Sequence, residues 1–412
     1  MTNEADESSK RVVFLTGSSG FLGGVLAKQL QSDTSVAKIY CPIWIKKGML
    51  GADRLAQCLG SCNKCIHLEM DDAIPSDTTH VILNAYSTRF DEELSVKLEG
   101  SVAPTLKLLE DCYRLKESIQ GITFVSTAYV QPPLPYRSDE KGRIPFLLES
   151  SHSSMTAKQV YDVALRSDTA AIAELLQDLD PYYRNNSYLF SKHLMEHLLT
   201  EQYHDLPVCI VRPSLICPSL DLQDGWTTRS SVFFLASIAP RYIFMSPRCK
   251  GKVNLVLVED VTKDCIEAVF KLARPASKDG NGQLWHPIIS STAHSNTTVV
   301  LALFKATAPH VPRMDIRKEW LLNLVRKIEF SMVSLSAGQN AARKLEAAYG
   351  YFDYTHANTW EFECRHSEQT PQTAIESVPR YYLSTSNSKT VRQALGADGT
   401  NRPDGECVTT NL

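Results

Sequence analysis

The feature that most constrains this chain is the segment Thr16-Gly17-Ser18-Ser19-Gly20-Phe21-Leu22-Gly23, in which glycines recur every third residue. It follows an apolar, β-branched run at 11–16, which is typical of a buried parallel strand, and it precedes a helical pattern. Gly17 can make the tight turn, Gly20 lets the backbone approach a diphosphate, and Gly23 permits close packing of helix on strand. The segment therefore predicts a dinucleotide site on a helix N-terminus. A glycine-rich turn without a ligand is the alternative.

Strand-like and helix-like segments alternate along the chain, and this alternation sets the fold class. Apolar runs predict further strands at 38–43, 80–83, 121–126 and 208–212. Apolar residues at helical spacing predict helices at 21–30, 102–114 and 188–203. Because a strand, helix, strand repetition implies parallel strands joined by right-handed crossovers, we expect an α/β protein with an extended Rossmann fold and a doubly wound parallel sheet.

The same patterns divide the chain into unequal parts. We expect a disordered N-terminus at 1–10, an NAD(P)-binding Rossmann domain with substrate-site insertions at 11–290, a C-terminal capping region at 291–400 and a flexible tail at 401–412. The insertion at 131–186, with an expected helix at 169–179, makes the substrate-binding part smaller and discontinuous. The C-terminal region is expected to be mainly helical. Its amphipathic helix at 318–335 either covers the substrate cleft or packs on the main domain.

Charge and cysteine content exclude several classes of function. The 43 basic and 46 acidic side chains give a net charge of -3, so no overall field attracts polyanions and we expect no nucleic-acid partner. The 11 cysteines are scattered and odd in number, which favours reduced thiols. Cys58, Cys62 and Cys65 have the spacing of an iron–sulfur motif. Because they lie at the edge of a nucleotide-binding unit, we interpret them as ordinary half-buried thiols and predict no metal site.

The sequence also predicts that the chain does not enter a membrane. Residues 1–10 are polar and acidic, and the longest apolar runs, such as 231–239, are much shorter than the roughly 20 residues that span a bilayer. We therefore expect a soluble, cytoplasmic protein with no transmembrane segment. No particular oligomeric state is indicated.

A second group of polar residues predicts carbonyl chemistry. Tyr188 and Lys192 are one helical turn apart and share a face, and Thr127 follows Ser126 at the carboxyl end of an expected strand. A phenol can donate a proton to a carbonyl oxygen while a neighbouring ammonium lowers the phenol pKa and holds the nicotinamide ribose, and a hydroxyl can orient the same oxygen. We therefore predict Thr127, Tyr188 and Lys192 as catalytic residues. A tyrosine and a lysine exposed on a surface helix are the alternative.

Together with further blocks, these motifs resemble the extended short-chain dehydrogenase/reductases, and within them the fatty acyl-CoA reductases and the related male sterility NAD-binding domains. The blocks that carry the resemblance are Thr16–Gly23, Ala85–Glu92, Val125–Tyr129, Ser187–Lys192, Val211–Ser214 and Gly225–Trp226. A weaker likeness to the family's C-terminal domain continues through 351–362. The cofactor-binding residues that the resemblance implies are Thr16, Gly17, Ser19, Gly20, Phe21, Leu22, Gly23, Ala85, Tyr188, Lys192, Pro213 and Ser214.

The resemblance implies reduction of an acyl thioester, such as an acyl-CoA, or of an aldehyde, with NADPH as hydride donor. Addition to the thioester gives a hemithioacetal that expels thiolate, and a second hydride would give an alcohol. The expected partner is a small-molecule acyl or carbonyl substrate. A ketoreductase or alcohol dehydrogenase of specialised metabolism on the same scaffold is the alternative. The intact Thr127, Tyr188 and Lys192 argue against a cofactor-binding regulator without turnover.

The sequence departs from the family pattern near the expected adenosine. Where the family usually has an arginine after the second strand, this chain has Trp44, followed by Lys46 and Lys47. The lysines can still neutralise a 2′-phosphate, and no acidic residue stands there to bind a 2′-hydroxyl, so NADPH is favoured and NADH is possible. A solvated loop is the alternative interpretation of the two lysines.

Two further positions differ from the family. A short connection before Val81 leaves Asp71 or Asp72 as the candidate adenine contact. The asparagine that many members carry in the helix before the Ser-Thr strand aligns with Ser101, so a proton relay through that position is not expected.

Overall fold

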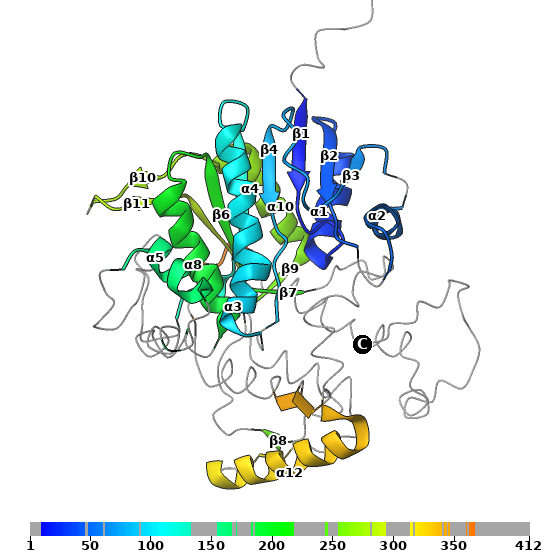
Figure 1. The fold of residues 1–412 in the computed structure, drawn as a ribbon, viewed down its shortest axis with the longest axis vertical. Helices are drawn as coiled ribbons and strands as arrows, with labels where there is room; N and C mark the ends of the chain where they lie inside the picture. The colour runs from blue at the N-terminus through cyan, green and yellow to red at the C-terminus, as the bar shows by residue number, and fades with distance from the viewer. Residues whose placement is uncertain are drawn as a thin grey trace, which may run out of the picture.

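A parallel sheet of seven strands forms the centre of the molecule (Figure 1). The computed structural model describes residues 10–45, 48–60, 62–89, 92–132, 155–166, 170, 183, 186–217, 244–245, 254–280, 282–293, 314–315, 318–339, 342–343, 345–346, 360 and 362–366. The strands of the sheet are β1 (Arg11–Leu15), β2 (Val36–Pro42), β3 (Cys65–Leu68), β4 (His80–Leu83), β5 (Gly121–Val125), β6 (Val208–Pro213) and β12 (Ile288–Ser291). Their order is β12-β6-β5-β4-β1-β2-β3, which confirms the doubly wound Rossmann fold, with its switch point between β1 and β4.

The remaining described elements are helices around the sheet and short strand pairs. The helices are α1 (Phe21–Ser32), α2 (Gly51–Leu59), α3 (Leu94–Lys97), α4 (Ala103–Arg114), α5 (Ala157–Leu165), α8 (Ser187–Gln202), α10 (Val258–Glu267) and α12 (Glu319–Ala337), with short helical turns η1 (Leu98–Val102), η2 (Ala128–Val130) and η6 (Ala268–Leu272). The short pairs are β7 (Leu215–Cys217) with β9 (Leu255–Leu257), β8 (Phe244–Met245) with β13 (Met314–Asp315), and β10 (Ser277–Lys278) with β11 (Leu284–Trp285).

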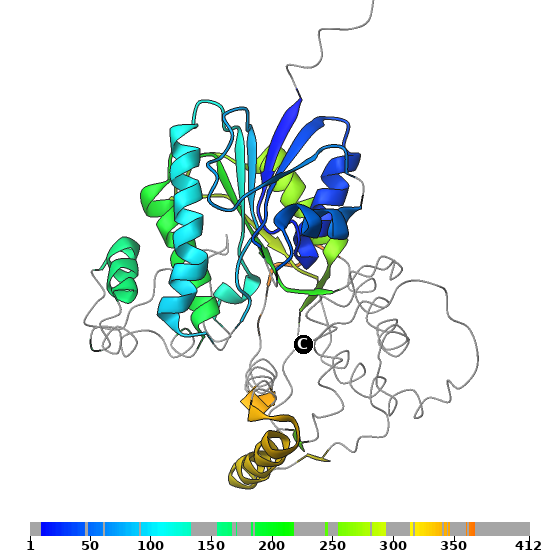
Figure 2. The same cartoon turned by 45° about the vertical axis from the view of Figure 1, so that its right-hand side comes forward.

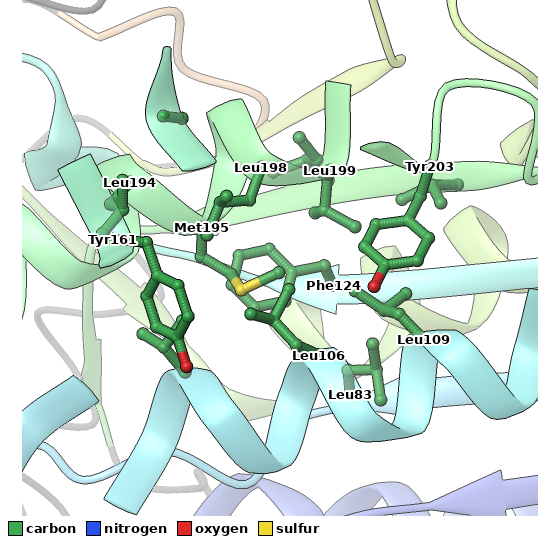
Figure 3. Packing of buried hydrophobic residues seen from close by; sticks show 14 of the residues in the cluster. Leu83, Leu106, Leu109, Phe124, Tyr161, Leu194, Met195, Leu198, Leu199 and Tyr203 are labelled. Carbon is green, nitrogen blue, oxygen red and sulfur yellow. The ribbon is translucent and has the colours of Figure 1, made fainter. Parts of the chain in front are cut away.

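Each face of the sheet carries its own apolar core, because neighbouring residues of a strand point to opposite faces. On one face, Phe14 and Phe124 pack with side chains of α4, α5 and α8, as Figure 3 shows in part. On the other face, Val13 and Leu15 pack with α1 and α10. Figures 1 and 2 show these two helical layers. All five apolar strand runs expected from the sequence lie in this doubly covered sheet.

The helices expected from apolar spacing are confirmed within a few residues at each end. The helix expected at 102–114 begins earlier, with the π-helical turn η1, and the one expected at 318–335 is α12, which lies beyond the carboxyl-terminal edge of the sheet. The expected helix at 169–179 lies outside the described residues. Helix α5 was not expected, although its start carries a signal: Thr156 and Gln159 form a capping box.

A short C-terminal segment returns to the Rossmann domain. Trp360 is buried in the core beside α8, donates a hydrogen bond from Nε1 to Gln131 O (3.0 Å), and contacts the Tyr129 ring edge-on at 5.4 Å. Phe362 contacts the same ring at 5.5 Å, and His366 bridges to Ala293 after β12. Residues 360 and 362–366 therefore pack next to the strand end that carries Thr127.

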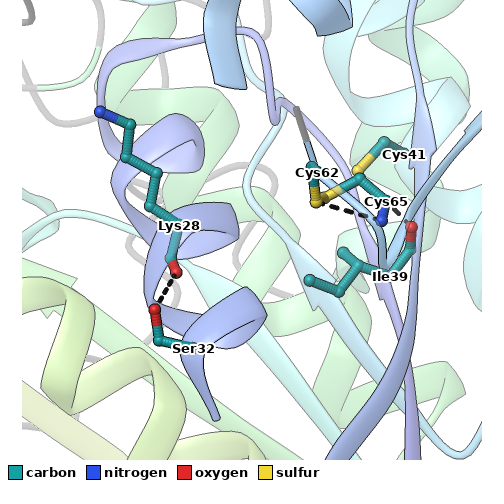
Figure 4. The surroundings of a disulfide bond; sticks show 6 residues. All are labelled: Lys28, Ser32, Ile39, Cys41, Cys62 and Cys65. Carbon is teal, nitrogen blue, oxygen red and sulfur yellow. Dashed lines mark hydrogen bonds between the residues drawn. A yellow bond between two sulfur atoms is a disulfide. The ribbon is translucent and has the colours of Figure 1, made fainter. Parts of the chain in front are cut away.

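The expectation of reduced thiols is wrong for one pair of cysteines. Cys62 and Cys65 form a disulfide at the start of β3, next to β2, whose Cys41 is free (Figure 4). Cys58 is also free. Within the described part of the chain, no cluster of His, Cys, Asp or Glu side chains could hold a metal ion. The described helices include none that is long and apolar enough to cross a bilayer.

Candidate active site

The turn between β1 and α1 is packed so closely that glycine is required at two positions. Gly17 has a φ of +71°, a left-handed conformation that glycine adopts without strain. A Cβ atom on Gly23 would lie 2.0 Å from Gly17 O, so the helix approaches the turn more closely than any side chain allows. Gly20 donates its N–H to Gly17 O at 2.9 Å. The tight turn at Gly17 and the close packing at Gly23 agree with this geometry, and the approach of a diphosphate to Gly20 stays a prediction.

The N-terminus of α1 offers backbone donors to an anion. Gly20 is the N-cap and has no side-chain cap, and the first turn contains no acidic residue. The first N–H groups of a helix lack intrahelical acceptors and carry the positive end of the helix dipole. Phe21 and Leu22 begin this turn, and its backbone N–H groups fit the diphosphate of a dinucleotide.

Thr16 joins the glycine turn to the segment after β4. Its hydroxyl accepts N–H bonds from Asn84 (2.8 Å) and Ala85 (2.9 Å) and donates to Ile82 O (3.3 Å). The Asn84 amide lies against Gly17 and Gly23, so close that a Cβ on either glycine would meet it. Thr16 and Ala85 were predicted, whereas Asn84 was not, because its position depends on how β1 and β4 pair.

Arg54 is the second residue of the site that sequence patterns missed. It projects from α2, donates from Nη2 to Ser19 Oγ at 3.0 Å, and donates from Nη1 to Trp44 O. The guanidinium therefore lies between the glycine turn and the segment after β2, where Rossmann proteins bind the 2′ group of the adenosine ribose. Lys46 and Lys47, predicted for this role, lie outside the described residues.

Two of the predicted catalytic residues lie near the carboxyl ends of β5 and β6. Lys192 of α8 donates from Nζ to Val125 O at 2.5 Å. Thr127, two residues further on, is buried, and its Oγ1 lies 3.5 Å from Pro213 O. Ser126 Oγ and Ser214 Oγ are buried here without a hydrogen-bond partner among the described residues. Unpaired buried hydroxyls are costly, so they mark where a polar ligand would fit.

Burial controls the electrostatics of Lys192. Only 3% of the residue is exposed, and this burial holds the pKa of its amine well below the ordinary value. The carboxylate of Glu196, one turn along α8, opposes that effect, while the charge of Lys97 adds to it. Glu196 is itself held by Arg212 of β6, through Nε at 3.0 Å and Nη2 at 2.5 Å.

Tyr188 lies on the same face of α8, half-buried, among aromatic and basic side chains. Its ring is 6.2 Å from the ring of Tyr86 and 5.9 Å from Lys97 Nζ. The Tyr86 ring in turn lies 3.5 Å from Lys192 Nζ. The predicted phenol and amine therefore share one cluster with Tyr86, whose side chain links them.

A buried ion pair fixes the segment that follows β4. Lys97 has no exposed surface, and its Nζ bonds Glu92 Oε2 (2.6 Å), Arg89 O (2.7 Å) and Ser87 O (3.0 Å). Burial raises the pKa of Glu92, but hydrogen bonds from Lys97 and Ser87 outweigh it and leave that pKa below its usual range. Ser187 donates to Glu92 O at 2.8 Å, which ties this segment to the start of α8, next to Tyr188.

Other predicted positions lie apart from this cluster or cannot be placed. The Asp71 carboxylate is 89% exposed and lies 3.9 Å from Lys107 Nζ of α4, so the structure does not gather it into the site. Ser101 accepts the Ser87 N–H at 3.2 Å, which gives its hydroxyl a structural partner. Phe90, Asp91, Gly225, Trp226 and residues 351–359 lie outside the described residues.

Comparison with known proteins identifies related sequences. The chain matches the family model described as male sterility protein over residues 15–66 and 65–265. It is similar to fatty acyl-CoA reductase wat of Drosophila melanogaster, with 24% identity over 245 residues that cover 52% of this chain and 44% of that protein. It is also similar to fatty acyl-CoA reductase 1 of Mus musculus, with 26% identity over 234 residues that cover 50% of this chain and 43% of that protein. The chain thus spans about half the length of the curated relatives it matches.

Solved structures with a similar fold include two reductase domains. The terminal R domain from the myxalamid PKS-NRPS biosynthetic pathway has a TM-score of 0.55 and 16% identity, covering 97% of this chain and 88% of that one. The PhqB reductase domain from Penicillium fellutanum has a TM-score of 0.54 and 12% identity, covering 91% of this chain and 93% of that one. At these identities the likeness concerns the fold alone.

Proposed function

Because the chain belongs to the male sterility protein family, within the extended short-chain dehydrogenase/reductases, we propose that it is an NADPH-dependent reductase of an acyl thioester or an aldehyde. Its curated relatives carry the name fatty acyl-CoA reductase, which supports a thioester as substrate. The observation that supports the proposal most is the bond from Lys192 Nζ at 2.5 Å to the carbonyl oxygen of Val125, which precedes Thr127 by two residues.

The proposed reaction divides between the cofactor and three side chains. When bound, NADPH supplies a hydride to the carbonyl carbon. The Tyr188 hydroxyl donates a proton to the carbonyl oxygen, and the protonated amine of Lys192 stabilises the phenolate that remains. Thr127 Oγ1 donates to the same oxygen and orients it. With a thioester the product of this step is a hemithioacetal, whose C–S bond breaks to give an aldehyde and a free thiol.

The glycine turn and its surroundings supply the proposed cofactor site. The N–H groups at the start of α1 would hold the diphosphate, and Thr16, Ser19 and Ala85 are proposed to contact the cofactor beside them. Lys192, Pro213 and Ser214 are proposed for the nicotinamide end.

Replacing Tyr188 by Phe tests the chemistry. We expect Tyr188→Phe to lower kcat/KM by about 10²- to 10⁴-fold, because the proton donor is lost while the ring stays. The assay follows thiol release from acyl-CoA beside NADPH consumption with aldehydes and ketones, since only thioester reduction releases a thiol. Tyr113→Phe, at an exposed tyrosine of α4, is the matched control. If Tyr188→Phe kept activity within a few-fold of the parent, the assignment of the proton donor would be wrong.

The contacts of Arg54 favour NADPH over NADH in this proposal. Arg54 is the cation near Ser19 and Trp44, and a charged hydrogen bond contributes about 1.5–3 kcal/mol. Arg54→Gln should therefore lower kcat/KM for NADPH roughly 10- to 100-fold and leave the value for NADH within a few-fold. Steady-state kinetics with both dinucleotides measure this, with Lys158→Gln on the exposed side of α5 as control. Equal losses for the two dinucleotides would contradict the role in selectivity.

A further inference from the structure

The ring of Tyr86 lies under the amine of Lys192. Lys192 Nζ is 3.5 Å from the centroid of the Tyr86 ring and 4.6 Å from that of Phe124. Its hydrogen bond to Val125 O uses one of the three N–H donors of an ammonium group. A cation over an aromatic face within about 6 Å is attracted by the negative charge of that face, most strongly where water is excluded.

Tyr86 also touches the proposed proton donor. Its ring meets that of Tyr188 at 6.2 Å and an angle of 75°, and its hydroxyl oxygen is buried. Burial raises the pKa of Tyr86, so this phenol stays protonated and neutral. One uncharged ring therefore contacts both side chains that the carbonyl chemistry needs.

The charged groups around Lys192 have opposing effects on its protonation, so the contribution of the Tyr86 ring matters. Glu196 of α8 favours the protonated amine, but the same carboxylate binds Arg212 through two hydrogen bonds. Lys97 of α3 disfavours the protonated amine, and Glu92 partly offsets the charge of Lys97 through their ion pair. Among the described residues, two aromatic rings lie near Lys192 Nζ and favour its charged form, and the ring of Tyr86 is the closer of the two.

We propose that Tyr86 is a positioning residue, whose ring holds the Lys192 amine at the end of β5 beside Tyr188 and favours its protonated state. The catalytic consequence rests on the proposed function, whereas the contact and its effect on Lys192 do not.

The proposal predicts a change in how stability depends on pH. A lysine whose pKa is lower in the folded chain than its ordinary value near 10.4 makes the free energy of unfolding rise with pH between those two values, because the unfolded chain then binds more protons. Loss of the ring face lowers the folded pKa further. The rise in stability should then begin at lower pH.

The test measures the free energy of unfolding of the full chain by denaturant titration between pH 5 and 10. Tyr86→Phe keeps the ring, whereas Tyr86→Leu and Tyr86→Met remove it, and each is made alone and together with Lys192→Met. We expect the rise to begin about 0.5–1.5 pH units lower in the ring-free variants than in Tyr86→Phe, and this difference to vanish when Lys192 is replaced. Tyr161→Leu, at a buried tyrosine of α5, should lose stability equally at every pH.

Two outcomes would overturn the proposal: the same pH dependence in the Phe and ring-free variants, or a difference that persists with Lys192→Met. A second measurement is the pH profile of kcat/KM, whose alkaline limb should move to lower pH in Tyr86→Leu and stay in place in Tyr86→Phe. If the parent chain reduces no acyl-CoA or aldehyde while the stability difference is found, the proposed function fails and the role of Tyr86 stands. If the parent is an active reductase and the stability difference is absent, the proposed function stands and the role of Tyr86 fails.

Discussion

Single residues of this site differ in how far the sequence can reveal them. The glycines, Thr127, Tyr188 and Lys192 belong to patterns of fixed spacing, so they could be predicted without coordinates. Lys97 could not, because a lysine in a helical pattern is normally assigned to solvent, and here it is fully buried. Its position follows from carbonyls and a carboxylate supplied by the segment after β4. The spacing of residues in the sequence thus reveals residues that belong to a motif within one helix, strand or turn. It does not reveal residues such as Lys97, whose partners come from another segment.

At the residue scale, Gly23→Ala should abolish dinucleotide binding and destabilise the fold. The new Cβ would lie 2.0 Å from Gly17 O and 2.6 Å from Gly17 C, so the turn or the helix must move. Titration with NADPH, followed by its fluorescence, and thermal unfolding measure the two effects. Gly100→Ala is the control, since its Cβ meets no atom within 4 Å and alanine favours a helix by about 1 kcal/mol. Tight NADPH binding by Gly23→Ala would contradict the close approach seen here.

At the scale of elements, the strands were easier to predict than the connections. Five buried strands could be recognised in the sequence as apolar runs, because helices cover both faces of the sheet. Helix α5 was not predicted because it lies in a segment without clear glycine or strand signals at its boundaries. Its capping box was nevertheless present in the sequence as Thr156-x-x-Gln159. The return of residues 360 and 362–366 to the domain has no local sequence signal, since their hydrogen bonds go to Gln131, Asp264 and Glu267, far away in the sequence.

The attachment of that segment to α10 should depend on pH. His366 Nε2 lies 2.7 Å from Asp264 Oδ2, with Asp260 at 4.0 Å and with Arg365 held by Glu267 and Asp264. The hydrogen bond with Asp264 raises the pKa of His366, against the effect of burial. This contribution to stability is complete below the unfolded pKa, near 6.5, and is lost as pH rises through the higher folded pKa.

The measurement is the difference in Tm between the parent and His366→Gln from pH 5.5 to 8.5. The difference should be largest at the acidic end and shrink as the pH rises. His204→Gln, at an exposed histidine, provides the control. A Tm difference that stays constant over this range would show that His366 acts without its charge.

For the whole molecule, one sheet separates two apolar cores. Alternate residues of each strand enter different cores, so Val13 and Leu15 serve one and Phe14 serves the other. The overall fold could therefore be predicted from strand runs, helical spacing and the glycine turn. The placement of Arg54 and Tyr86 could not, because it depends on how separate elements pack in three dimensions.

Substitutions in the two apolar cores should lower the free energy of unfolding additively. Leu26→Ala in α1 and Leu198→Ala in α8 each remove a buried side chain from a different face, and each should cost about 2–5 kcal/mol. Because the sheet lies between them, the double variant should lose the sum to within about 0.5 kcal/mol. Chemical denaturation measures all three values. The contrasting pair is Leu194→Ala with Leu198→Ala, because both side chains lie in the same core. If the deviation from additivity were equal in the two pairs, the sheet would not separate the two cores energetically.

Burial also decides which reagents can reach the amines of this site. Lys97 has no exposed surface and Lys192 is 3% exposed, whereas the side chains of Lys107 and Lys158 face water. Acetylating reagents attack an unprotonated amine that solvent can reach. Surface lysines should therefore react first, and Lys97 and Lys192 should react only when local unfolding exposes them. Mass-spectrometric mapping of acetyl groups at Lys97 and Lys192 would then measure how fast solvent gains access to these two amines.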